Sequence, residues 1–154
     1  MCAALLGACD RERVAKLEEG VSTEADVRAQ FGEAAATYNE PDGGRTLEFP
    51  RQPEGQTNYM ITIGADGKMS ALRQVLKPAE FAKVTPGLDK AQVRRLLGRP
   101  AVTQRFELKR EEQWDWRWLD GQTSKLFNVV FDADGKVTAT SVMDDPRAVS
   151  PGGK

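Results

Sequence analysis

Two segments of the chain are near copies of each other: ITIGADGKM at residues 61–69 and VVFDADGKV at residues 129–137. Each places apolar residues before an Asp-Gly pair, which is typical of a β-strand that ends in a tight hairpin turn. Asp134 lies 68 residues after Asp66, and the residues upstream repeat with nearly the same spacing. The 154-residue chain therefore predicts two copies of one small structural unit.

Two short helices are predicted at the start of each copy. In the first half, Val14 and Leu17 lie on the apolar side of a helix that ends at Gly20. A second helix begins at its N-cap, Thr23, and ends at Gly32. The second half repeats these signals with Pro78, Phe81, Val84, Gly87, Asp89, Val93, Leu97 and Gly98.

Three strands are predicted after the helices of each copy. They lie near residues 46–49, 59–63 and 68–76 in the first half and near residues 114–118, 127–131 and 136–143 in the second. The predicted fold class is therefore α+β, with two tandem units that each pack two helices on a three-stranded antiparallel sheet. The predicted units are residues 10–76 and 77–145, and residues 146–154 are expected to be a disordered tail.

The N-terminal residues 1–9 are small and apolar, and the composition becomes charged at Asp10. Leu6-Gly7-Ala8-Cys9 resembles the lipobox of bacterial lipoproteins, in which the cysteine is lipidated after cleavage. We therefore interpret residues 1–9 as the remnant of a signal peptide and Cys9 as a lipid anchor to the membrane. Asp10 occupies the position that retains some enterobacterial lipoproteins at the inner membrane.

Composition argues against several classes of function. The chain has no histidine, 23 acidic and 22 basic residues, and no basic block for a row of phosphates, so no nucleic acid partner is expected. The carboxylate pairs Glu111/Glu112 and Asp144/Asp145 are adjacent in sequence and point in different directions, so we interpret them as solvated. No catalytic, metal-binding or cofactor-binding residue and no small-molecule substrate are predicted, and the protein is expected not to be an enzyme.

All three tryptophans, Trp114, Trp116 and Trp118, share one face of a predicted strand, with Asp115 and Arg117 on the other. The tryptophans fit a core beneath Phe81, Val93 and Leu97. Exposed aromatics beside arginine are equally typical of protein-binding surfaces, and this alternative stays open, above all for Trp118. The candidate partner-binding residues are Trp118, Arg117, Asp115 and Trp116.

The second half resembles a known family on three segments: GLDKAQVRRLLGRP at residues 87–100, WDW at residues 114–116 and VFDADGKV at residues 130–137. These are similar to the SmpA/OmlA (BamE) domain of envelope lipoproteins. The first half is a looser copy, with Ala34 where the family pattern has proline. Tandem copies of this topology are also similar to the β-lactamase inhibitor proteins.

The resemblance implies a non-enzymatic lipoprotein that binds envelope or outer-membrane assembly proteins. The expected location is the periplasm, with the lipid in the cell envelope and the outer membrane favoured by the family, although Asp10 leaves the inner membrane possible. The alternative is an inhibitor that grips a soluble enzyme with a concave sheet face. The resemblance does not identify the partner.

Overall fold

The computed structural model describes residues 10–148, which form two compact units. The first unit contains the described residues up to Arg51 together with Asn58–Gln74, and the second contains Gln52–Thr57 together with the described residues from Val75 onward. The expected lipobox with Cys9 lies outside the described residues, as do residues 149–154 of the expected tail. Residues 146–148 form a turn, closed by a hydrogen bond from the Ala148 N–H to the Asp145 carbonyl (2.9 Å).

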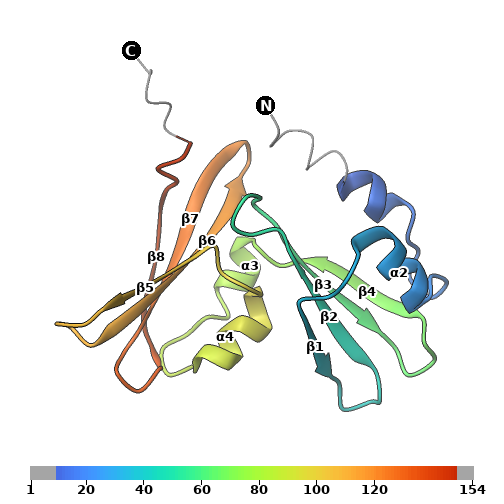
Figure 1. The fold of residues 1–154 in the computed structure, drawn as a ribbon, viewed down its shortest axis with the longest axis horizontal. Helices are drawn as coiled ribbons and strands as arrows, with labels where there is room; N and C mark the ends of the chain where they lie inside the picture. The colour runs from blue at the N-terminus through green and yellow to red at the C-terminus, as the bar shows by residue number, and fades with distance from the viewer. Residues whose placement is uncertain (1–9, 149–154) are drawn as a thin grey trace. The chain divides into compact units, whose positions relative to one another are not determined.

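The first unit places its helices on one face of a four-stranded antiparallel sheet (Figure 1). Residues 10–15 are helical and precede α2 (Glu24–Phe31). The sheet has the order β1 (Ala36–Asn39), β2 (Arg45–Pro50), β3 (Asn58–Ile63) and β4 (Met69–Gln74).

The second unit repeats this arrangement with longer central strands (Figure 1). Its helices are α3 (Pro78–Phe81) and α4 (Lys90–Leu97). Its sheet has the order β5 (Val102–Phe106), β6 (Glu111–Asp120), β7 (Thr123–Phe131) and β8 (Val137–Asp144). No helix within residues 10–148 combines the length and apolar character needed to span a membrane.

The same local signals begin the main helix of each unit, as the sequence predicts. Thr23 caps α2, and Asp89 caps α4 in the same way. Each forms a capping box with the third helical residue, Asp26 or Gln92, so two backbone N–H groups at each helix start gain side-chain partners. The helix starts are thus determined locally in both copies.

Each unit has its own apolar core between its helices and its sheet. In the first unit the core consists of Val27, Phe31, Leu47, Phe49, Tyr59, Ile61, Ile63 and Met69. The buried apolar residues of the second unit include Phe81, Val84, Val93, Leu97, Trp116, Trp118, Phe127, Val129, Phe131 and Val137. The repeated apolar positions of the sequence are therefore the repeated core positions of the structure.

The prediction of three strands per sheet is wrong, because β1 and β5 add a fourth strand to each. Both are edge strands, and β5 is exposed along almost its whole length. β5 lacks the alternation of apolar and polar residues by which a half-buried strand is recognised, and β1 alternates over only four residues, too few to predict a strand. Their positions depend on pairing with β2 and β6, and the sequence pattern does not contain that information.

Candidate partner-binding surface

The three tryptophans of β6 line the inner face of the second sheet. Trp116 is completely buried, and its indole N–H donates to the Gly98 carbonyl at the end of α4 (3.0 Å). Trp118 is 4% exposed and meets the Phe81 ring of α3 edge-on at 5.0 Å between centroids. Trp114 is half-buried and contacts Phe131 at 4.9 Å. This face packs the helices onto the sheet.

Asp115 and Arg117 lie on the outer face of the same sheet, where they belong to a buried polar network. Asp115 accepts hydrogen bonds from Asn128 (2.6 Å) and Gln113 (2.9 Å). Arg117 forms an ion pair with Asp145 (3.3 Å), and Asp145 also accepts from the Ser124 hydroxyl (2.8 Å). Buried charges are tolerated when paired and hydrogen-bonded in this way.

A loop from the first half of the sequence completes this network. The Gln52 side chain donates to the Arg117 carbonyl (2.9 Å) and accepts from the Arg117 N–H (3.0 Å), so its amide bonds to β6 as a neighbouring strand would. The adjacent strand, β5, begins at Val102 opposite Asp115, so it stops short of Arg117. Gln52 is 4% exposed. The loop Gln52–Thr57 therefore belongs to the second unit by its contacts as well as by its packing.

Asp115 and Arg117, two of the candidate partner-binding residues, have buried side chains in this structure. The sequence does not reveal this, because the covering loop comes from the other half of the chain. Trp116 and Trp118 are buried as well. The structure brings the four candidate residues together on one strand, but as core and network residues, and their contact with a partner stays a prediction.

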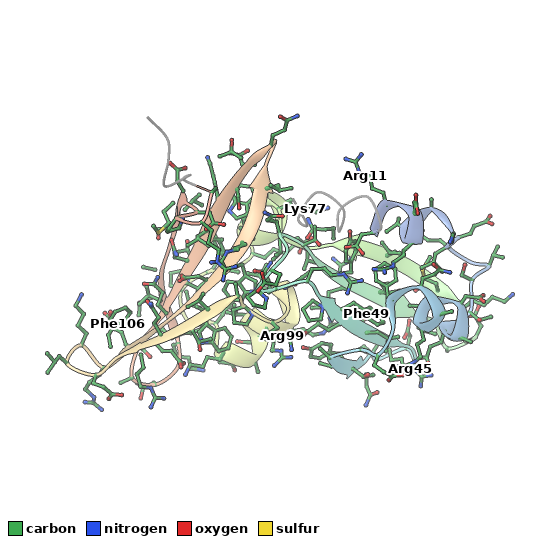
Figure 2. The ribbon with its side chains drawn as sticks, turned by 45° about the horizontal axis from the view of Figure 1, so that its top comes forward. Arg11, Arg45, Phe49, Lys77, Arg99 and Phe106 are labelled. Atoms are coloured by element: carbon green, nitrogen blue, oxygen red, sulfur yellow. The ribbon has the colours of Figure 1, made fainter. Side chains whose placement is uncertain are left out.

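The most exposed large apolar side chain among the described residues lies instead at the turn between β5 and β6. We call residues 106–111 the hairpin tip. Leu108 is fully exposed and Phe106 is 40% exposed. Figure 2 shows Phe106 at the far end of the β5–β6 hairpin. This feature was not predicted from the sequence, although two apolar residues inside the charged run RFELKREE are a detectable signal.

An open groove of about 240 Å³ lies beside the hairpin tip. Its charged lining residues are Lys90, Arg105, Glu107, Arg110, Glu111, Glu112 and Asp132, and Phe106 supplies an aromatic wall. Lys90, at the start of α4, pairs with Glu112 and lies 5.8 Å from the centre of the Phe131 ring. Charges of both signs around an aromatic ring suit recognition of a polypeptide segment more than of a single anion.

Arg110 gives the hairpin tip an unusual backbone. It adopts a φ of 55°, the left-handed region that side-chain-bearing residues rarely occupy, and its N–H donates to the Glu107 carbonyl (3.2 Å). Glycine would adopt this conformation without steric strain. An arginine thus occupies a position whose backbone conformation favours glycine, and its side chain lines the groove.

Two further electrostatic features involve residues outside the groove. Within residues 10–148, no group of three His, Cys, Asp or Glu side chains is placed to hold a metal ion. A hydrogen bond from Arg45 lowers the pKa of the Glu24 carboxyl, and a hydrogen bond to Asp120 raises the pKa of the Lys125 ammonium. Both shifts belong to ion pairs outside the groove.

Residues 74–141 match a protein family described as the outer membrane protein assembly factor BamE domain. The matched segment runs from the end of β4 to within β8, so it includes the hairpin tip and the groove. No curated protein matches the sequence significantly.

Solved structures similar to the chain share low sequence identity with it. One is described as the osmotically inducible lipoprotein OsmE (24% identity, 46% of this chain and 75% of that chain covered, TM-score 0.40). Another is YjgB of Bacillus subtilis, a DUF4309 family protein (18% identity, 84% and 82% covered, TM-score 0.33). A third is described as a β-lactamase inhibitor protein from Streptococcus mutans (11% identity, 89% and 96% covered, TM-score 0.37).

Proposed function

We propose that this protein is a non-enzymatic lipoprotein of the bacterial cell envelope that binds other proteins during outer-membrane protein assembly. The observation that carries the proposal is the match of residues 74–141 to the BamE domain of outer-membrane assembly factors. The partners are then envelope or outer-membrane assembly proteins, and recognition takes the place of catalysis. The membrane is reached through lipid on Cys9, in the outer membrane or, if Asp10 acts as a retention signal, the inner one.

Within this function we assign partner contact to the hairpin tip and its groove. The Leu108 and Phe106 side chains expose apolar surface to solvent. Burying this surface against a partner protein would favour association. The surrounding charges of both signs provide ion pairs at the rim of an interface, where they govern specificity and association rate more than affinity. The buried face with Trp116 and Trp118 holds this surface in place.

The test is crosslinking in intact cells, followed by purification from detergent-solubilised envelope and mass spectrometry. Wild-type protein should recover outer-membrane assembly proteins. Cys9→Ser should lose most of this recovery, because an unanchored protein is diluted away from the membrane. Leu108→Asp should lose it while remaining lipidated, because it places a charge in the apolar centre of the interface.

A matched control keeps the result interpretable. Asp42→Ala changes the β1–β2 turn of the first unit, the equivalent of the hairpin tip, and should recover the same proteins as wild type. Recovery of one soluble enzyme by both the wild-type and Cys9→Ser proteins would contradict the proposal and favour an inhibitor. Unchanged recovery by Leu108→Asp would place the binding surface elsewhere.

A further inference from the structure

One edge of the second sheet is open. Strand β8 is the last strand of its sheet, and within residues 10–148 no strand pairs with its far side. Seven of its eight residues are exposed. Its sequence, VTATSVMD, contains no lysine or proline, the residues that commonly protect edge strands from pairing with another chain.

The register of β7 and β8 shows which backbone groups are available. The Asp145 N–H donates to the Ser124 carbonyl (3.2 Å), so alternate residues of β8 bond to β7. The N–H and C=O groups of Thr140, Val142 and Asp144 consequently point away from the sheet. At the start of the strand the same edge is occupied, because Val137 exchanges hydrogen bonds with Gly87 and Leu88 (2.9 and 2.8 Å).

The open part of the edge also carries exposed apolar side chains. Val142 is 51% exposed and Met143 is 47% exposed. The corresponding strand of the first unit, β4, has no large apolar residue with comparable exposure. Of these two equivalent strands, only β8 therefore carries large apolar side chains with this exposure.

We propose that two copies of this protein associate through β8, with the strands antiparallel and Val142 opposite Val142 of the partner subunit. This register pairs Thr140 with Asp144 of the partner subunit, so every outward backbone group of the open segment gains a partner. It places the two exposed Val142 side chains against each other on one face of the joined sheet, with Met143 opposite Ser141 of the partner subunit on the other face.

Charge and chain termination support this register. Asp144 is the only charged residue of β8, and it faces a threonine, so no like charges are opposed. Pro146 ends each strand before it reaches the edge occupied by Gly87 and Leu88. The interface is isologous and closes after two copies. It is short, so association should be reversible and depend on concentration.

The test uses the full chain with Cys2→Ser and Cys9→Ser, which removes lipidation and adventitious disulfides. Analytical ultracentrifugation over a range of concentrations should show a monomer–dimer equilibrium. Val142→Lys places like charges across the axis and should raise the dissociation constant at least about tenfold. Ser70→Lys on β4 is the matched control on the other sheet and should leave the dissociation constant unchanged.

A cysteine pair tests the register. In the same background, Val142→Cys should form a disulfide-linked dimer under mild oxidation, because facing residues of paired strands lie within disulfide range. Thr140→Cys should not, because each Thr140 faces Asp144 of the partner subunit, which leaves the two cysteines four residues apart along the strands. A chain that stays monomeric, a dimer that Val142→Lys does not weaken, or equal crosslinking of the two cysteine variants would overturn the proposal. Circular dichroism of each variant checks that it is folded.

Discussion

The two units carry the same ion pair with its charges exchanged. In the first, Glu24 at the start of α2 pairs with Arg45 on β2 (2.5 Å). In the second, Lys90 at the start of α4 pairs with Glu112 on β6. A helix N-terminus favours negative charge, so Glu24 gains from the helix dipole and Lys90 does not. The repeated backbone therefore places an ion pair between the helix start and the second strand of each unit, but which of the two positions carries the positive charge differs between the copies.

A second pair of equivalent positions, Arg51 and Trp118, also forms a contact to the first helix of each unit through different side chains. Arg51 lies after β2 and bonds to Asp10 of the N-terminal helical segment (3.2 Å), with its guanidinium 5.3 Å from the Phe31 ring centre. The equivalent residue of the second unit, Trp118, packs against Phe81 of α3. The Arg51 and Asp10 side chains are only 22% and 7% exposed, so this ion pair is largely buried, as the Trp118–Phe81 contact is. The first helix of each unit is thus held at the same position, by an ion pair in one copy and by an aromatic contact in the other.

The largest expected effect comes from emptying either core. Trp116→Ala should reduce the free energy of unfolding of the second unit by about 3–5 kcal/mol, because it leaves a cavity and removes the bond to Gly98. Phe49→Ala should cost the first unit a similar amount. Native-state hydrogen exchange measures each unit separately. A loss below about 1 kcal/mol in either would contradict the cores described above.

Gln52→Ala should have the next largest effect on the free energy of unfolding. The unit it destabilises should be the second one, although Gln52 lies in the first half of the sequence. It leaves the Arg117 N–H and C=O without partners, at a cost of about 1–3 kcal/mol. Denaturation followed by tryptophan fluorescence reports on the second unit, which holds all three tryptophans. Gln56→Ala, whose bond to Ser124 is long (3.5 Å), is the control and should change little. Equal effects would contradict the special role of Gln52.

Removing the helix caps tests whether the copies are locally equivalent. Thr23→Ala and Asp89→Ala each remove the side chain of a capping box and should cost about 1 kcal/mol in the free energy of unfolding of their own units. Hydrogen exchange of the α2 and α4 amides measures both. A cost confined to one unit would show that the helix starts are not equivalent.

The smallest effect concerns the exchanged ion pair. The hydrogen bond from Arg45 lowers the pKa of Glu24 from the ordinary value of 4.5. The pair therefore contributes stability above the unfolded pKa and loses it as pH falls through the lower folded pKa. Glu24→Gln should flatten the loss of stability below about pH 4.5, measured by denaturation from pH 7 to pH 3. Glu19→Gln is the control, and an identical change in both variants would contradict the assignment.

The parts of the fold that depend on local signals were predictable. The capping residues Thr23 and Asp89 and the Asp-Gly turns at Gly67 and Gly135 occupy their expected places, and both glycines have positive φ, of 81° and 75°. Trp116 is a core residue because the alternation of β6 requires it. These features follow from a few neighbouring residues, so a single sequence contains them.

The unpredicted features depend on contacts between distant residues. Strands β1 and β5 form because a neighbouring strand pairs with them, since β1 is too short and β5 too exposed for their own residues to predict a strand. The loop that begins at Gln52, 65 positions earlier, covers Arg117: Gln52 bonds to the Arg117 backbone, and the Pro53 carbonyl accepts a hydrogen bond from the Arg117 guanidinium (3.4 Å). Leu108 is exposed because it stands at the end of a hairpin whose length is set by pairing. The candidate surface was therefore harder to predict than the core.

Site-specific photocrosslinking in intact cells tests whether the hairpin tip contacts outer-membrane assembly proteins. A photoreactive residue at position 108 samples the hairpin tip, and one at position 42 samples the equivalent turn of the first unit. If the hairpin tip binds the partner, position 108 should crosslink to outer-membrane assembly proteins and position 42 should not. Crosslinks to those proteins from position 42 alone, or to a soluble enzyme from position 108, would contradict this assignment.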